Sequence, residues 1–294
     1  MNLLTAWLIP GVVMVIMFAM GLALHPRDFA AVARSPKAFA LGLVSQLMVL
    51  PVLGFLVAAL TAPDPRLAVG LVIIAACPGG PMSNFLTHLA RADTALSISL
   101  TATTSFISIL TLPLIVSMGL ALFLGTAAPP ISVTDTILAI TTMTLLPVSA
   151  GMIVAWLWPQ AGARMEPWAR RVALVCFVGL IVAAIAVDWD RVVAYTGAVA
   201  PLVVLLNVAA MGSAYVLALA AGLPPERAIA ITIECGIQNG SLAMFVGATL
   251  LHDELMMLPG AAYGVLMFPT AFAFIVWVVR RERAKARAAG ESLG

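Results

Sequence analysis

A carboxylate in the middle of an apolar segment is the first candidate for chemistry in this sequence. Residues 228–251 are long and apolar enough to cross a bilayer, yet Glu234, Gln238 and Asn239 lie near the middle of this stretch. The glycines on either side of these residues favour an interruption of the helix. A charge at that depth is costly unless it is compensated, so we interpret Glu234 as a functional residue rather than a protonated or internally paired structural one.

Hydroxyl side chains in a second apolar run suit the same chemistry. Ser97, Thr101, Thr104 and Ser108 follow one another at spacings of four, three and four, which places them on one face of a helix. Ligation by oxygen alone, with one carboxylate, fits Na⁺ better than a transition metal, which prefers His or Cys. We therefore expect a coupling cation and no other cofactor.

The composition indicates what positions these groups. Of the 294 residues, 63% are hydrophobic and 10% are charged, whereas soluble chains carry about 25% charged residues. Apolar runs of about 20 residues recur from end to end, which predicts an all-α polytopic membrane protein. The composition excludes an ordinary soluble domain, and we expect a lipid bilayer rather than nucleic acid as the surroundings. We predict nine transmembrane spans, at 3–24, 38–60, 67–90, 94–124, 134–158, 172–190, 197–221, 228–251 and 261–280.

Two details accompany this span prediction. The segment 94–124 is longer than a bilayer needs, so it is expected to contain a turn outside the membrane. Thirteen of the 15 basic residues fall on alternate connections or in the tail 281–294 and the residue before it. The positive-inside rule then predicts an external N-terminus, a basic cytoplasmic tail and a location in the plasma membrane, which is the inner membrane of a bacterium.

The spans also form a repeat. The third span is broken at Cys77–Pro81 and the eighth at Glu234–Gly240, and Gln46 and Asn207 hold matching places in the second and seventh spans. Matching spans are five spans apart, so the two halves must have opposite orientations in the membrane. An inverted repeat with two broken helices that cross at the midplane predicts the binding site of a transporter.

Each break releases backbone groups that could bind ions. Carbonyls at the end of a first half-helix suit a hard cation, and amides at the start of a second half-helix suit an anion. We expect Ser83 or Asn84 to cap one second half-helix, and Asn239 or Ser241 to cap the other.

Two motifs resemble those of a known family. CPGGPMSNFLTHLARADTALSISLT (Cys77–Thr101) and ECGIQN (Glu234–Asn239) are similar to the two crossover motifs of the bile acid:sodium symporter family, as are SQLMVLP (Ser45–Pro51) and MFAMGLALHPRDF (Met17–Phe29). The resemblance covers essentially the whole chain. It implies a nine-span member that lacks the first span of ten-span relatives. It also implies a core domain (spans 38–124 and 197–280) that moves against a panel domain (spans 3–24 and 134–190).

The same resemblance implies the site. On matching positions, a first sodium ion would bind Ser83, Asn84, Ser97, Thr101 and Glu234. A second would bind Gln46, Glu234, Gln238 and the carbonyls of Cys235 and Ile237. The solute would lie beside Asn239, Pro81, Met82 and Met267.

Two departures from the family bear on the solute. Pro81 replaces a hydroxyl or amide residue that the family often has near the substrate, and the middle of the last span reads YGVLMFPTAF, without the polar residues of some members. A small keto or hydroxy acid is therefore at least as good a candidate as a bile acid.

The function expected from all this is sodium-coupled import of an organic anion by alternating access. The alternatives are a proton-coupled carrier that uses Glu234, an exporter of an oxyanion on a related fold and, less favoured, a receptor that transports nothing. An intramembrane enzyme is disfavoured because Ser83 and His88 are poorly placed on one helix to act as a nucleophile and base. The sequence leaves the oligomeric state open.

Overall fold

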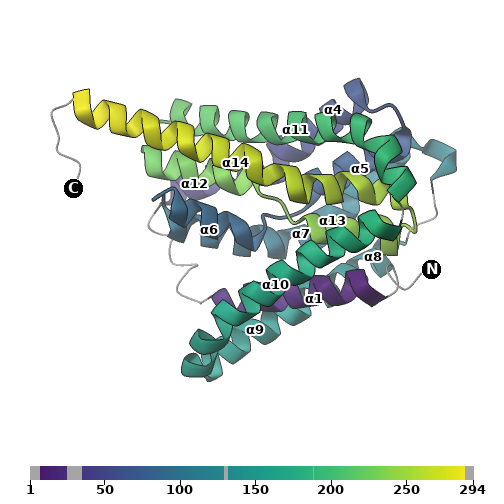
Figure 1. Ribbon diagram of the computed structural model, residues 1–294, viewed down its shortest axis with the longest axis horizontal. Helices are drawn as coiled ribbons and strands as arrows, with labels where there is room; N and C mark the ends of the chain where they lie inside the picture. The colour runs from purple at the N-terminus through teal and green to yellow at the C-terminus, as the bar shows by residue number, and fades with distance from the viewer. Residues whose placement is uncertain (1–6, 25–34, 129–131, 188, 289–294) are drawn as a thin grey trace.

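The chain is a bundle of helices that is elongated along one axis, with α11 and α14 running close to that axis (Figure 1). The computed structural model describes residues 7–24, 35–128, 132–187 and 189–288. The start of the first predicted span, the basic residues Arg27 and Arg34, and residues 289–294 of the tail lie outside these ranges. Within them, six helical segments are long and apolar enough to cross a membrane, which confirms a polytopic membrane protein. The count of nine spans stays a prediction.

The helices of the first half run from α1 to α7. They are α1 (Ile9–Ala23), α3 (Pro36–Val44), the π-helical turn η3 (Ser45–Val49), α4 (Leu50–Thr61), α5 (Pro65–Ala76), α6 (Pro81–Leu89) and α7 (Thr94–Phe123). A short turn η4 (Gly125–Ala127) follows. The rest are α8 (Val133–Ile140), η5 (Thr141–Leu145), α9 (Leu146–Leu157), α10 (Pro159–Val187), α11 (Trp189–Ala220), α12 (Pro225–Gly236), α13 (Gly240–Met244), η6 (Phe245–Leu250) and α14 (Glu254–Ala288).

The prediction of a turn within 94–124 is wrong. α7 is one unbroken helix of 30 residues with Pro113 in its interior. Such a helix is about 45 Å long at 1.5 Å per residue, which matches a bilayer with its headgroup regions rather than the hydrocarbon core alone. Tilting and protruding ends accommodate the extra length without a turn.

The two predicted breaks lie where α5 gives way to α6 and α12 gives way to α13. Gly79 pairs with Gln238 across the breaks as an isolated antiparallel bridge. The amide of Gly80 donates to the carbonyl of Ile237 at 2.9 Å, and the amide of Asn239 donates to the carbonyl of Pro78 at 3.0 Å. Each break therefore supplies partners for backbone groups that the other releases, as a chain inside a membrane requires. The predicted meeting of the breaks is confirmed.

The packing separates a group of three helices from the rest. α1 packs along α9 and α10, and these helices lie together on one side of the molecule, opposite α11, α12 and α14 (Figure 1). α5 and α12 lie inside the remaining bundle, since α5 is buried from Leu67 to Ala76 and α12 from Ala228 to Gly236. This is the arrangement that a panel and a core need, and the division into two moving bodies stays a prediction.

Candidate functional site

The carboxylate of Glu234 lies inside the bundle and accepts hydrogen bonds from hydroxyl groups on two other helices. Ser83 Oγ of α6 and Ser97 Oγ of α7 approach its Oε2 at 2.7 and 2.9 Å. Thr101 Oγ1, one turn further along α7, approaches Oε1 at 2.7 Å. Glu234 is 1% exposed and the three hydroxyl residues are fully buried. The break and the two helices thus bring three hydroxyls to one carboxylate away from solvent.

The short oxygen–oxygen contacts around Glu234 outnumber the hydroxyl protons that could form hydrogen bonds there. Ser97 Oγ lies 2.9 Å from Asn84 Oδ1 as well as 2.9 Å from the Glu234 carboxylate. Thr101 Oγ1 lies within 3.3 Å of Asn84 Oδ1 and of Ser83 Oγ, besides its bond to Glu234. A hydroxyl has one proton and can donate one good hydrogen bond. The remaining short oxygen–oxygen contacts form a set of lone pairs that fits a hard cation.

All five residues expected at the first sodium site therefore lie together. We name them the carboxylate cluster: Ser83, Asn84, Ser97, Thr101 and Glu234. Thr104 and Ser108, further along the same face of α7, do not join it. Their hydroxyls donate to backbone carbonyls of α7, at Thr101 and Ser105 respectively.

The residues expected at the second sodium site meet on the other side of the break. The side-chain amides of Gln46 and Gln238 face each other, with Gln46 Nε2 at 2.8 Å from Gln238 Oε1. Gln238 Nε2 donates to the carbonyl of Cys235 at 2.9 Å and lies 3.4 Å from that of Glu234. The carbonyl of Ile237 already accepts the amide of Gly80, so only its second lone pair is left for a cation.

The ends of the half-helices follow the predictions in part. Asn239 caps α13, because its Oδ1 accepts the amide of Leu242 at 3.1 Å, and Ser241 Oγ donates to the same oxygen. The expected cap by Ser83 or Asn84 is wrong. α6 begins at Pro81 after Gly80, and Ser83 Oγ lies 2.8 Å from the carbonyl of Gly80 and caps no amide of α6. The residue in the N-cap position is Gly80, which has no side-chain oxygen, and Ser83 and Asn84 already lie within the helix.

A cavity of about 440 Å³ lies between the three-helix group and the break in the eighth predicted span. Asn239, Met82 and Met267 line it, as expected for the solute, and the side chain of Pro81 is not among those described. The wall on α10 carries Glu166 and Arg170, which bond to each other, one helical turn apart.

Sequence reasoning used Arg170 only for orientation and gave Glu166 no role. The helical spacing of the two residues was the available signal, but such pairs are common on exposed helix faces.

A second polar network, centred on Asn207, was not predicted from the sequence. Asn207 Nδ2 of α11 donates to the carbonyl of Gly236 at 2.7 Å and to the Tyr263 hydroxyl at 2.9 Å. Thr270 Oγ1 donates to Asn207 Oδ1 at 2.5 Å. Asn207 was noted only as the repeat partner of Gln46. The network fixes the end of α12 against α14.

Known proteins resemble this chain along most of its length. A family model described as the sodium bile acid symporter family matches residues 10–195, more than half of the chain. The uncharacterized sodium-dependent transporter YocS of Bacillus subtilis is 28% identical over 85% of this chain and 76% of its own length. The human ileal sodium/bile acid cotransporter is 27% identical over 88% of this chain and 74% of its own.

A probable chloroplastic sodium/metabolite cotransporter, BASS2 of rice (Oryza sativa subsp. japonica), is 26% identical over 86% of this chain. The chain spans 59% of that protein's length.

Proposed function

This chain belongs to the sodium bile acid symporter family, and we propose that it is a symporter that couples Na⁺ entry to the import of a small organic anion by alternating access. It is a membrane transporter of that family rather than an enzyme. The names of these relatives refer to sodium-dependent transport, and those of the rice and human proteins also to metabolites and bile acids respectively. The identity of the ion, the class of solute and the mechanism for this chain form the proposal.

The carboxylate cluster is the observation that carries the proposal. Glu234 supplies one negative charge, and the hydroxyl and amide oxygens around it lie 2.7–3.3 Å from one another or from the carboxylate. A proton would need only the carboxylate of Glu234 as its binding group, whereas this site offers four further oxygens, one from each other residue of the cluster. Sodium is the coupling ion that such a set favours.

A second sodium ion would bind where Gln46 faces Gln238. Both amides currently donate through Nε2, to each other or to backbone carbonyls. Turning the Gln238 amide over would direct its oxygen toward the carbonyl of Cys235 and toward Gln46 Oε1, which now lies 3.3 Å from Gln238 Nε2. A cation between them would then meet two side-chain oxygens and one carbonyl oxygen. Glu234 contributes to both sites, since its carboxylate belongs to the first and its carbonyl borders the second.

The charge of the sites favours an anionic solute. Two Na⁺ ions beside one carboxylate leave one net positive charge in a medium of low dielectric constant, and a monoanion would neutralise it. The N-terminus of α13 adds partial positive charge at the cavity wall. Asn239 Nδ2 lies 3.9 Å from the Met17 thioether, which is a weak acceptor that a carboxylate oxygen would replace.

The position of the cavity indicates which state this is. Its lining includes the last residues of α1 and α9 and the first residues of α7 and α10. The distribution of basic residues assigns those helix ends to the cytoplasm. We therefore propose that the structure corresponds to an inward-facing state in which the solute would leave toward the cytoplasm.

Uptake by proteoliposomes tests this function. The solutes are cholate, as a bile acid, and pyruvate, as a small keto acid, each with an inward gradient of Na⁺, of H⁺ or of neither. Accumulation driven by the Na⁺ gradient alone supports the proposal. Accumulation that follows the H⁺ gradient in sodium-free medium establishes the proton-coupled alternative, and outward accumulation establishes the exporter.

A further inference from the structure

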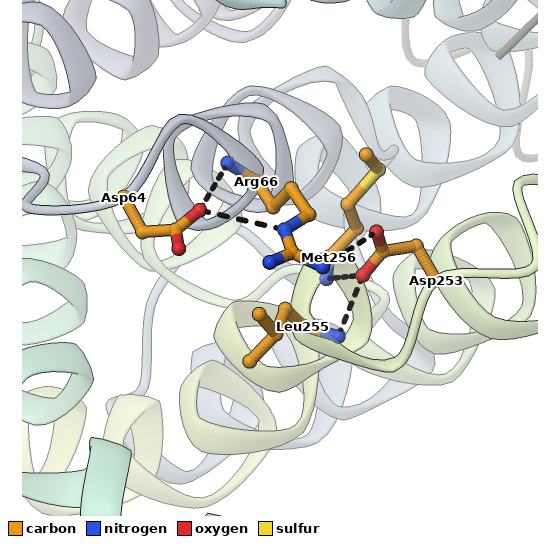
Figure 2. A network of polar contacts seen from close by, with 5 residues as sticks. All are labelled: Asp64, Arg66, Asp253, Leu255 and Met256. Atoms are coloured by element: carbon orange, nitrogen blue, oxygen red, sulfur yellow. Dashed lines mark hydrogen bonds and ion pairs between the residues drawn. The ribbon is translucent and has the colours of Figure 1, made fainter. Parts of the chain in front are cut away.

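Two ion pairs at opposite ends of the bundle are related by the repeat. Arg227, at the start of α12, lies with its Nε 3.6 Å from Asp93 Oδ2. Arg66, at the start of α5, lies with a guanidinium nitrogen 3.8 Å from Asp253 Oδ2, and it also approaches Asp64 (Figure 2). The offset in sequence from Arg66 to Arg227 equals that from Asp93 to Asp253 to within a single position. We call the Arg227–Asp93 pair the α12–α7 clasp and the Arg66–Asp253 pair the α5–α14 clasp.

The two clasps also share their local geometry. Asp93 Oδ1 accepts the amide of Leu96 and caps α7. Asp253 Oδ1 accepts the amides of Leu255 and Met256 at the start of α14, as Figure 2 shows. Shortly before each aspartate, one residue adopts a left-handed backbone, Arg91 with φ 55° and His252 with φ 54°. Each clasp therefore ties the first half of one broken helix to the helix that follows the other.

The geometry points to the α12–α7 clasp as a positioning device for the carboxylate cluster, and this inference rests on the proposed sodium site. Ser97 lies one turn after Asp93, and its amide donates to the carbonyl of Asp93 at 3.2 Å. Thr101 follows one turn later, and Glu234 lies two turns after Arg227 on the same face of α12. The clasp thus holds the starts of the two helices that bring these oxygens together.

Backbone contact strengthens the same link. The amide of Asp93 donates to the carbonyl of Glu226 at 3.1 Å, next to Arg227 in the chain. The α5–α14 clasp holds no such oxygens, because Met257 and Ala261 occupy the places after Asp253 that Ser97 and Thr101 occupy after Asp93. The repeat therefore provides an internal control, one clasp beside the cluster and one remote from it.

The role of the clasp is geometric rather than a large source of stability. The side chains of Arg227 and Asp93 are 34% and 25% exposed, and those of Arg66 and Asp253 are 49% and 20% exposed. Ion pairs this exposed contribute little to the free energy of unfolding. A cation site, in contrast, needs its ligands within about 0.5 Å of their places, so a small shift of α7 against α12 weakens binding.

Thermal-shift titration of the whole purified protein with NaCl tests this, at constant ionic strength maintained with choline chloride. The variants Asp93→Asn and Arg227→Gln remove the charge pair, and Asn keeps the oxygen that caps α7. We expect each variant to raise the half-saturating sodium concentration about fivefold. A change of this size in a binding equilibrium is within what the loss of one surface ion pair can cause. The double variant should do no more than either single one, because both remove one interaction.

The controls are Asp253→Asn and Arg66→Gln, which should leave the half-saturating sodium concentration unchanged, and Arg227→Lys, which keeps the charge and should behave as the unaltered protein. Equal sodium shifts at both clasps, or none at the α12–α7 clasp, overturn the proposal.

Hydrogen exchange in sodium-free medium tests, without any bound ion, whether the α12–α7 clasp positions α7. Arg227→Gln should speed exchange of the amides at 97–101, and Arg66→Gln should speed exchange at 257–261. If Arg227→Gln leaves exchange in α7 unchanged, the clasp does not position that helix and the inference fails. If the unaltered protein shows no stabilisation by sodium, the proposed function fails instead, while the exchange result still stands for the clasp.

Discussion

Gln46 and Asn207 donate to equivalent carbonyls in the two halves of the chain. Gln46 Nε2 lies 3.2 Å from the carbonyl of Cys77, where α5 ends, and Asn207 Nδ2 lies 2.7 Å from that of Gly236, where α12 ends. The two amides differ in what else they contact. Gln46 faces the amide of Gln238, whereas Asn207 is bound by two hydroxyl groups. Gln46 therefore has an amide partner that could turn with it, whereas Asn207 is held by two hydroxyl groups on α14.

This difference predicts distinct effects of two matched substitutions. Gln46→Ala removes a proposed ligand of the second sodium ion, so the Hill coefficient for sodium in uptake should fall toward one. Asn207→Ala leaves the hydroxyl of Tyr263 and the carbonyl of Gly236 with one partner fewer, which should lower the free energy of unfolding by about 1–3 kcal/mol. It should leave the Hill coefficient as it is. Sodium-dependent uptake and thermal unfolding of both variants check this. Unchanged cooperativity in Gln46→Ala contradicts the second site.

Glu234→Gln preserves the volume of the side chain and removes the negative charge of the carboxylate cluster. We expect loss of sodium-dependent uptake and of stabilisation by sodium, in a protein that still inserts and elutes as a single species. Glu226→Gln, at an exposed glutamate at the start of α12, is the matched control and should transport normally. Normal sodium-coupled uptake by Glu234→Gln, with only its pH dependence lost, establishes the proton carrier instead.

Gly79 allows the first break to lie directly against the carboxylate. A methyl group at this position would overlap Glu234 Oε1, closer than any real contact. Gly79→Ala should raise the half-saturating sodium concentration about tenfold or more, because overpacking such a site costs about 1–3 kcal/mol. Gly212→Ala, on an exposed face of α11 where a methyl group would meet open space among the described residues, should leave sodium dependence intact. Sodium titration of both variants makes the comparison, and equal behaviour would show that the carboxylate moves aside at no cost.

Asn239 combines a structural role with a proposed contact to the solute, and two substitutions separate them. Asn239→Ser keeps an oxygen that can cap α13 and loses the amide nitrogen, whereas Asn239→Ala loses both. Both variants should bind pyruvate or cholate more weakly in sodium medium while retaining stabilisation by sodium. Asn239→Ala should in addition unfold at lower temperature, since losing a cap costs about 1 kcal/mol. Solute binding by Asn239→Ser as tight as in the unaltered protein argues against the proposed contact.

The sequence was sufficient to predict the two breaks and the residues that gather at them. Proline and glycine at Cys77–Pro81, and a carboxylate followed by two glycines in 228–251, both violate the rules for a plain transmembrane helix. The hydroxyl spacing on α7 then identified the face on which Ser97 and Thr101 lie, though not that Thr104 and Ser108 bond to their own helix. That distinction depends on how far α12 reaches along α7, which no local pattern encodes.

Other features depend on contacts between distant segments. The pairing of Gly79 with Gln238 and the two clasps join residues from different halves of the chain, and one sequence shows neither their distance nor their orientation. Arg66 and Arg227 were each interpreted as a charge in a connection, because their aspartate partners lie in other connections. The turn within 94–124 was wrongly expected for a related reason, since the tilt that accommodates a long helix is set by neighbouring helices rather than by composition.

The bridge between the breaks also constrains how the chain can change in length. Gly80 with Ile237, and Asn239 with Pro78, form a pair of bonds that depends on both breaks having their present number of residues. A single insertion into either break would shift the register of this pairing and turn the side chains after it to the opposite face. Gln238 would then point away from Gln46. Insertions should therefore be tolerated in the two breaks only as a matched pair, even though the breaks lie in opposite halves of the sequence.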